Sequence, residues 1–195
     1  MNKIGRKIYH MAGGFILVGL YLWLGRSVGL MVLAGICVIA TAVDLARLNS
    51  PSMNSFMYAH FSKFIRESEK GKLTGTPWYV LGVLLAMVLY GVPIGVYAVA
   101  FLACGDVAAT TVGEAWGKTK IWGGKSLEGT AAFVAAAVAV GLLIDVSFYP
   151  LSPAVFVVGA AVAAVVEVLP IGVNDNLSIP LVSGGVMYLL ARAGM

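Results

Sequence analysis

The chain carries no charged residue anywhere between Leu73 and Gly105. Such a run is too long for one comfortable membrane-spanning helix, which needs about 20 apolar residues, and slightly short for two. Across the chain 60% of the residues are hydrophobic and 11% are charged, whereas soluble domains have about 25% charged residues. A soluble protein of 195 residues has too little interior to bury this apolar surface. The sequence therefore predicts an integral membrane protein.

The apolar runs predict helices rather than a barrel. Val80–Leu89 and Ala131–Ile144 are apolar on every side, whereas barrel strands alternate apolar and polar residues. Proline cannot continue an upstream helix, so we divide the long uncharged run at Gly91-Val92-Pro93. The predicted fold class is an all-α, polytopic membrane protein with about seven transmembrane helices, forming a single integral membrane domain over residues 1–195. The predicted spans are residues 8–24, 28–43, 78–90, 93–111, 130–144, 153–168 and 178–191.

Charge asymmetry gives the predicted orientation. With a cytoplasmic N-terminus, eleven of the thirteen basic residues fall on the cytoplasmic side, and only Arg26 and Arg192 fall outside. Eight of the nine acidic residues lie on or near the same side, Asp145 being the exception. Ionisable groups at membrane depth usually face a cavity or a partner. Their clustering at one interface favours surface chemistry on a membrane-dissolved substrate over transport, on the cytoplasmic face of the cell membrane.

Residues 45–76 form a polar interruption between the spans. Aromatic and aliphatic residues recur there at near-helical spacing, which predicts a short helix lying on the membrane surface. The residues concerned are Phe56, Phe61, Phe64 and Ile65. Just before this segment, Asp44 and Arg47 are three positions apart, a spacing that allows them to pair with each other on a helix.

The segment 105–130 combines carboxylates, lysines and glycines. On a helix, Asp106, Thr110, Gly113 and Gly117 fall along one stripe of mostly small residues, which lets a ligand or another helix approach the backbone. The lysines that follow stand among further glycines, whose exposed backbone N–H groups suit a polyphosphate. These lysines are Lys118, Lys120 and Lys125. In an alternative interpretation, the glycines serve helix packing and the lysines serve membrane topology.

Further residues could bind a metal or an anion, or could cap a helix. Asp106 or Glu128 could hold a magnesium ion that bridges phosphates, and Thr130 opens a helix whose N-terminus favours anions. Glu167 ends an apolar helix and needs a cation or metal nearby. Asn176 or Ser178 is the expected N-cap of the last helix. Asp175 would be stabilised near that positive helix end even without a function.

The N-terminal cluster also allows two interpretations. Lys3, Arg6, Lys7 and His10 recur every three or four residues and can share one helix face. Arg6 and His10 could contact a phosphate, or they could anchor the first helix at the interface.

Together these clusters resemble a known family. The motifs are Cys-Gly-Asp106-x-x-Ala-x-x-x-Gly113-x-x-x-Gly117-Lys118, Gly-Gly-Lys125-Ser126-x-Glu128-Gly129-Thr130, Asn174-Asp175-Asn176-x-x-x-Pro180 and Arg6-Lys7-x-x-His10. They resemble the CTP-dependent lipid kinases, a group that includes dolichol kinase, phytol kinase and the yeast-type CTP-dependent diacylglycerol kinase. The resemblance covers most of the chain. It extends distantly to the phosphatidate cytidylyltransferases, which share a Gly-Asp motif and a Lys-Ser/Thr-x-Glu-Gly motif.

The resemblance implies transfer of the γ-phosphate of CTP to the hydroxyl of a lipid alcohol at the cytoplasmic interface, with Mg²⁺. The alcohol would be a polyprenol, dolichol, phytol or diacylglycerol. The implied catalytic residues are Asp106, Glu128 and either Asp175 or its rival His10 as the base. The implied metal ligands are Asp106, Glu128 and Glu167. The implied nucleotide-binding residues are Arg6, Gly105, Thr110, Gly113, Gly117, Lys118, Lys120, Lys125, Ser126, Gly129, Thr130, Asn174 and Asn176.

Two other functions stay open at this point. A phosphatidate cytidylyltransferase is the nearest alternative. A small transporter is a more distant one, because the spans of a transporter would carry polar residues near their middle and the predicted spans here have almost none. The expected partners are CTP, a lipid alcohol and the bilayer, with no nucleic acid. The Gly/Ala-rich spans would permit a homodimer.

Overall fold

The structure, a computed structural model, describes residues 3–61, 65 and 69–195. Helices make up most of this part of the chain, and its only bridge between extended segments is an isolated antiparallel pairing of Lys120 with Ser126. The helices are α1 (Lys3–Leu24), α2 (Arg26–Asn49), α3 (Pro51–Phe61), α4 (Gly75–Leu89), α5 (Ile94–Ala100), α6 (Asp106–Trp116), α7 (Leu127–Ser147), α8 (Pro153–Val168) and α9 (Asp175–Arg192). A π-helical segment, η2 (Phe101–Gly105), joins α5 to α6, and a short 3₁₀ turn, η3 (Trp122–Gly124), precedes α7. The prediction of an all-α fold is confirmed.

Several helices are suited to a membrane. Four stretches are long and apolar enough to cross one: Gly5–Leu24, Arg26–Asn49, Ile94–Trp116 and Leu127–Ser147. Two shorter helices, Gly75–Leu89 and Pro153–Val168, are also apolar. The predicted spans coincide with α1, α2, α4, the continuous α5–η2–α6 pass, α7, α8 and α9. The chain is therefore a polytopic membrane protein, while the number of spans and their orientation stay predictions.

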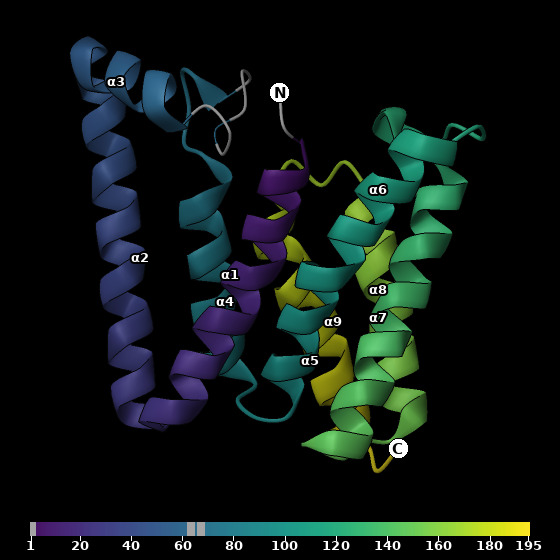
Figure 1. The fold of residues 1–195 in the computed structure, drawn as a ribbon. Helices are drawn as coiled ribbons and strands as arrows, with labels where there is room; N and C mark the ends of the chain where they lie inside the picture. Colours follow the sequence, from purple (N-terminus) through teal and green to yellow (C-terminus); the bar gives the residue numbers. More distant parts are fainter. Residues whose placement is uncertain (1–2, 62–64, 66–68) are drawn as a thin grey trace.

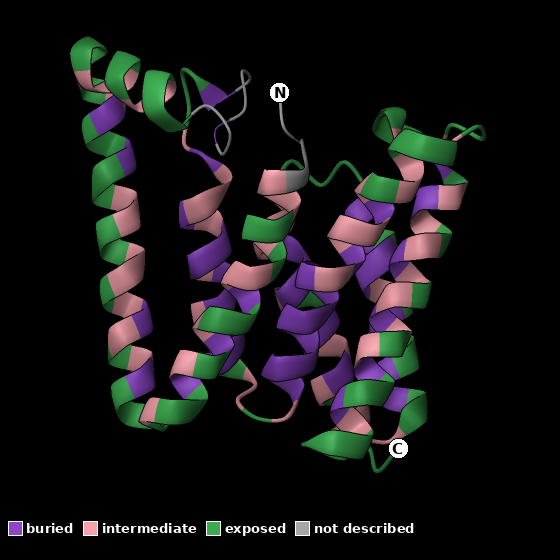
Figure 2. Ribbon diagram, viewed as in Figure 1, coloured by how far each residue is buried: buried purple, intermediate pink, exposed green. Residues whose placement is uncertain are grey.

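The α5–η2–α6 pass lies at the centre of the bundle. Figure 2 shows buried residues concentrated on α5, with more exposed residues on α2 and α7. Tyr97 of α5 and Phe101 of η2 have no exposed surface, and Tyr97 stacks on Phe156 of α8 with 5.7 Å between ring centroids. Between membrane helices, close van der Waals contact of such rings favours packing.

The π-helical segment ends directly before Asp106. Its last residue, Gly105, packs against the ring of Phe133 on α7 so closely that a Cβ atom would clash with it. Single-turn π segments inside longer helices occur frequently at functional sites. Here the segment places the first residue of α6 at the edge of the buried centre.

The polar connections gather at one end of the bundle. Figure 1 shows the N-terminus, α3, the loop between α6 and α7 and the connection between α8 and α9 at the top, with the C-terminus at the bottom. A short helix, α3, follows the second span as predicted, carries Phe56 and Phe61, and lies across this end beside α2, whereas Ile65 stands at a bend beyond its end. Of the residues that predicted it, Phe64 lies outside the described residues, and placement of α3 on a membrane surface stays a prediction.

The last helix begins earlier than the sequence analysis indicated. The N-cap is Asn174, whose side-chain oxygen accepts a hydrogen bond from the Asn176 backbone N–H at 3.0 Å. The prediction that Asn176 or Ser178 caps this helix is therefore wrong. The asparagine side chain satisfies one of the backbone donors that a helix start leaves open, so α9 extends back to Asp175.

Candidate active site

Two cavities meet at Thr110 near the polar end of the bundle. The first, which we call the Asp106 cavity, has a volume of about 320 Å³ and lies among α1, α2, α4, α6 and the start of α9. The second, which we call the lysine cavity, has a volume of about 330 Å³ and is lined by Lys120 and Lys125 together with residues of α6, α7 and the end of α8. Thr110, one turn after Asp106 on α6, lines both.

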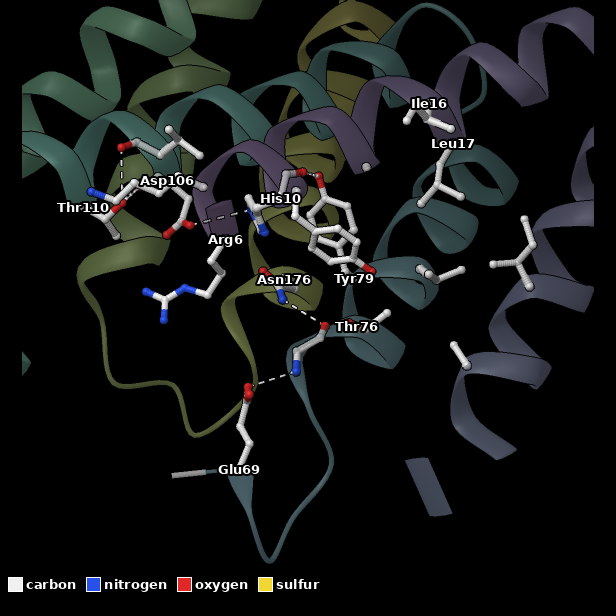
Figure 3. A pocket seen from close by; sticks show the side chains of 18 residues that line it. Arg6, His10, Ile16, Leu17, Glu69, Thr76, Tyr79, Asp106, Thr110 and Asn176 are labelled. Carbon is white, nitrogen blue, oxygen red and sulfur yellow. Dashed lines mark hydrogen bonds and ion pairs between the residues drawn. The ribbon is translucent and has the colours of Figure 1, made fainter. Parts of the chain in front are cut away.

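An acid–base pair lies at the polar end of the Asp106 cavity. The Nε2 atom of His10 on α1 is 3.6 Å from Oδ2 of Asp106 on α6 (Figure 3). The His10 ring packs against Tyr79 of α4 with 4.5 Å between centroids, and the Tyr79 hydroxyl donates a hydrogen bond of 2.8 Å to the His10 carbonyl. Three helices therefore fix the position of one imidazole.

The connection before α4 forms another wall of this cavity. Asn176 donates from its side chain to the Gly75 carbonyl at 3.0 Å, and the Gly75 N–H donates to Oε1 of Glu69 at 3.0 Å. Glu69, Gly75 and Asn176 all line the cavity, and Figure 3 labels Glu69 and Asn176. The first turn of α9 is thereby tied to the first turn of α4.

Arg47 holds that connection in place from the end of α2. Its side chain has only 1% of its surface exposed, and its Nε donates to Oδ1 of Asp44 at 2.8 Å. The guanidinium also donates to three backbone carbonyls of the connection, at 2.8–3.3 Å: those of Glu69, Lys70 and Lys72. Asp44 accepts from the Thr74 N–H through its other oxygen. The predicted pairing of Asp44 with Arg47 is confirmed, and its role as an anchor for this connection is a new observation.

The far end of the Asp106 cavity is apolar. Its walls there are aliphatic side chains from three helices: Ile16, Leu17, Ile36, Ala40 and Val80. In Figure 3, Ile16 and Leu17 lie on the opposite side of the cavity from Asp106 and Arg6. One cavity thus joins an acid–base pair at one end to a hydrocarbon surface at the other.

The lysine cavity is formed where the loop before α7 folds against α6. Ser126 is the N-cap of α7, and its hydroxyl accepts a hydrogen bond from the Gly129 N–H at 3.2 Å. Gly124, Ser126, Gly129 and Thr130 line the cavity, so the amino-terminal turn of α7 faces it. The N-terminal end of a helix has a partial positive charge, which adds to that of the lysines.

Three glycines also serve close packing of α6 against α7. A Cβ atom on Gly117 would collide with the Gly113 carbonyl and the Ser126 side chain, and one on Gly129 would lie 2.9 Å from the Ala109 carbonyl oxygen. The alternative interpretation from the sequence, that these glycines serve helix packing, is thus correct for Gly117 and Gly129. Gly113 and Gly129 also line the lysine cavity, whereas Gly117 does not.

Lys125 joins three separate segments by ion pairs. Its Nζ lies 3.0 Å from Oε1 of Glu167 at the end of α8 and 3.2 Å from Oδ2 of Asp175 at the start of α9, and it also donates to the Glu167 carbonyl. Burial lowers the pKa of Lys125, but the two carboxylates outweigh burial and raise it above the ordinary value. Glu167, predicted to need a cation, therefore has one.

The structure brings together most of the predicted site residues. The Asp106 cavity is lined by Arg6, His10, Asp106, Thr110 and Asn176. The lysine cavity is lined by Thr110, Gly113, Lys120, Lys125, Ser126, Gly129, Thr130 and Glu167.

The other predicted residues line neither cavity: Gly105, Gly117, Lys118, Glu128, Asn174 and Asp175. Lys118 is exposed, and both carboxylate oxygens of Glu128 accept from the Thr119 N–H, at 3.0 and 3.2 Å. Sequence reasoning missed Tyr79 and Glu114. Glu114 lines the lysine cavity and is 3.1 Å from the amine of Lys7.

Comparison with known proteins relates the chain to lipid kinases. It is 33% identical over 162 residues to CTP-dependent diacylglycerol kinase 1 of Schizosaccharomyces pombe, an alignment covering 75% of this chain and 74% of that one. It is 29% identical over 151 residues to the protein of the same name from Saccharomyces cerevisiae, covering 76% of this chain and 51% of the yeast protein. An uncharacterised Rickettsia prowazekii protein is 29% identical over 182 residues, which cover 90% of this chain and 88% of that one.

No family model and no solved structure matches the chain. The relationship thus rests on sequence similarity to the diacylglycerol kinases, over an alignment that covers about three quarters of both sequences in the fission-yeast case. The chain belongs to the family of CTP-dependent lipid kinases that includes these diacylglycerol kinases.

Proposed function

We propose that the chain transfers the γ-phosphate of CTP to the hydroxyl of a membrane lipid alcohol at the junction of the two cavities. The observation that carries this proposal is that Thr110 lines both cavities. A phosphate donor in one and an alcohol in the other would then meet beside a single residue. Diacylglycerol is the first candidate acceptor because the named relatives act on it; prenol-type alcohols present the same hydroxyl.

The lysine cavity is the proposed site for the triphosphate. Lys120 and Lys125 supply positive charge, and the first turn of α7 supplies backbone N–H groups. We place this end of the bundle on the cytoplasmic side because the basic residues concentrate there, in accord with the positive-inside rule. CTP in the cytoplasm would then reach the cavity directly.

The Asp106 cavity is the proposed site for the lipid hydroxyl. The oxygen of the lipid hydroxyl forms a new bond to the γ-phosphorus of CTP. The bond from that phosphorus to the β–γ bridging oxygen breaks, and CDP leaves with the electron pair. The hydroxyl proton passes to His10, which Asp106 orients and whose positive charge it stabilises. We favour His10 over Asp175 as the base, because Asp175 pairs with Lys125 and lines neither cavity.

Magnesium belongs to the proposal as an ion that arrives with the nucleotide. Among the described residues, no group of three histidine, cysteine or acidic side chains is close enough to hold a metal by itself. The single carboxylate of Asp106 fits the usual arrangement, in which Mg²⁺ is bound by one or two carboxylates together with substrate phosphates. Mg²⁺ bound there would neutralise phosphate charge. Glu167 and Glu128 are poorer candidates, since they bind Lys125 and Thr119.

The proposal is tested with purified protein, Mg²⁺ and a pool of diacylglycerol and prenols, using CTP labelled on its α- or its γ-phosphate. Label entering lipid from the γ position alone is the expected result, and the labelled product identifies the acceptor. If no label enters lipid, phosphatidate is added, and label that then enters lipid from the α position alone, as CDP-diacylglycerol, means that the enzyme is a cytidylyltransferase and that the proposal is wrong. Asp106→Asn should abolish transfer in a protein that keeps its thermal stability, and transfer by that variant would contradict the role of Asp106.

A further inference from the structure

We infer that the lipid acceptor enters the Asp106 cavity sideways from the bilayer, between α1 and α2, and keeps its hydrocarbon chain against Ile16, Leu17, Ile36 and Ala40. This inference rests on the proposed function and adds to it the site and the entry route of the acceptor. The occupant is a lipid alcohol with one hydroxyl at its polar end and one or more hydrocarbon chains at the other.

The two helices that flank this route are in close contact at one end only. A Cβ atom on Gly29 of α2 would lie 2.9 Å from the Cα and carbonyl oxygen of Tyr21 on α1, and Leu33 one turn later is fully buried. Beyond that point α1 and α2 diverge toward the polar end of the bundle, where Figure 1 shows α4 between them. The apolar end of the cavity is lined by residues of all three helices.

The apolar wall also continues onto the outer surface of the helices. Ile16 lines the cavity and still has 66% of its surface exposed, and that surface would contact lipid in a membrane. The cavity volume of about 320 Å³ is near the lower limit of about 300 Å³ for ligand pockets. It therefore accommodates the hydroxyl end and the adjoining part of a chain, and the rest of a long chain extends between α1 and α2 into the bilayer.

The polarity gradient of the cavity sets the direction of the lipid. His10, Asp106 and Thr110 lie at one end and the aliphatic wall at the other (Figure 3). An amphipathic alcohol bound in the reverse direction would bury its chain beside ionisable groups and leave its hydroxyl without a partner. The favoured direction brings the hydroxyl to the side where Thr110 adjoins the lysine cavity.

A third cavity of about 210 Å³ does not provide such a site. It lies among α1, α5, η2 and α7, and its lining, which includes Phe15, Val99 and Phe148, has no charged residue. It offers a lipid chain a binding surface but provides no group that could activate a hydroxyl. Among the three cavities, only the Asp106 cavity combines an aliphatic wall with an acid–base pair.

A matched pair of variants on α2 tests the inference. Ala40→Trp places a large ring in the apolar end of the cavity, whereas Ala42→Trp places the same ring at an exposed position that lines none of the three cavities. We expect Ala40→Trp to lower kcat/KM for dioleoylglycerol by about tenfold or more, about 1.4 kcal/mol, with unchanged CTP affinity. Ala42→Trp should match the unmodified protein. Equal activity of the two variants would overturn the inference.

Photocrosslinking tests the same site without relying on turnover. The probe is a diacylglycerol with a diazirine in its acyl chain, and the crosslinked peptides are identified by mass spectrometry. Crosslinks to α2 around Ile36 and Ala40, reduced in Ala40→Trp, support the inference. Crosslinks confined to α5 and α7 around Val99 and Ile144 would place the chain in the third cavity and overturn it. If the unmodified protein transferred no phosphate label from CTP to lipid, the proposed function would be refuted instead. The crosslink pattern would still decide where the lipid chain binds.

Discussion

Nε2 of His10 lies 3.6 Å from Oδ2 of Asp106, so that α1 and α6, which are distant in sequence, share one acid–base pair. The pair lies at the polar end of a cavity whose other end is aliphatic, and one turn further along α6 the second cavity begins at Thr110.

His10→Gln should lower kcat for lipid phosphorylation by about a hundredfold or more, because a glutamine amide cannot take up the hydroxyl proton. CTP affinity should change little, since His10 lines the acceptor cavity and not the lysine cavity. Initial rates with γ-labelled CTP and diacylglycerol measure the effect. His60→Gln is the control, because His60 is exposed on α3 and contacts its own helix. A His10→Gln enzyme with normal kcat would exclude His10 as the base.

Arg47→Met should destabilise the protein by about 3–5 kcal/mol, because it leaves the buried carboxylate of Asp44 without its cation. It also removes the donors that hold the backbone of residues 69–72. Thermal unfolding in detergent measures the loss.

Two further variants separate the causes. Asp44→Asn combined with Arg47→Met should recover part of the stability, since no charge is then left buried and unpaired. Arg26→Met, at the exposed start of the same helix, should leave the melting temperature unchanged. An Arg47→Met protein as stable as Arg26→Met would show that the buried pair contributes little.

Gly117→Ala should destabilise the protein by about 1–3 kcal/mol and weaken CTP binding, because the added methyl group forces α6 away from Ser126. The comparison is Gly19→Ala in α1, where no atom lies within 4 Å of the new Cβ. There the helix should gain about 1 kcal/mol from the higher helix propensity of alanine. Melting temperatures should fall for Gly117→Ala and rise for Gly19→Ala, and CTP titrations of both variants measure the change in nucleotide affinity. A Gly117→Ala protein with an unchanged melting temperature would refute the packing role of Gly117.

Lys125→Met should raise KM for CTP by about tenfold, because the triphosphate loses one of the two lysines in its proposed cavity. Lys118→Met is the matched control, since Lys118 is exposed and lines neither cavity. If the two variants had the same KM, Lys125 would have a purely structural role.

The contribution of Lys125 to stability should not depend on pH near neutrality. Its carboxylate partners raise its pKa above the ordinary lysine value of 10.5, so from neutral pH up to that value the lysine stays charged, and its contribution is lost only as the pH rises through the raised pKa. The difference in melting temperature between the unmodified protein and Lys125→Met should therefore stay constant from about pH 7 to about pH 9. A steady decrease across this range would contradict the raised pKa.

Local patterns in the sequence were enough to predict the helices. The charge-free run divided at Gly91-Val92-Pro93 as predicted, because proline and glycine act on the backbone locally. The start of α9 was misplaced because several adjacent residues can cap a helix, and the choice of Asn174 depends on which hydrogen bond forms.

The residues of the site were predictable where they belong to local motifs, but their arrangement in space was not. The segment from Asp106 to Thr130 was identified through its motifs, whereas the separation into two cavities depends on how α1, α2 and α4 pack beside it. Tyr79 stands in an apolar run where nothing distinguishes it from a core residue. Arg47 and Asp44 were expected to pair, but their contacts with residues 69–74 depend on tertiary structure.

The π-helical segment before Asp106 has a consequence for the phase of the central helix. One residue more per turn rotates everything that follows by about 100° relative to a regular α-helix. In a regular α-helix Asp106, five residues after Phe101, would lie about 140° around the axis from it, and the extra residue reduces this angle to about 40°. Asp106 and Thr110 therefore continue the face of Tyr97 and Phe101, which in a regular helix would pass through Gly105 and Ala109 instead. One face of the central pass is thus packed interior over its first half and lines the cavities over its second.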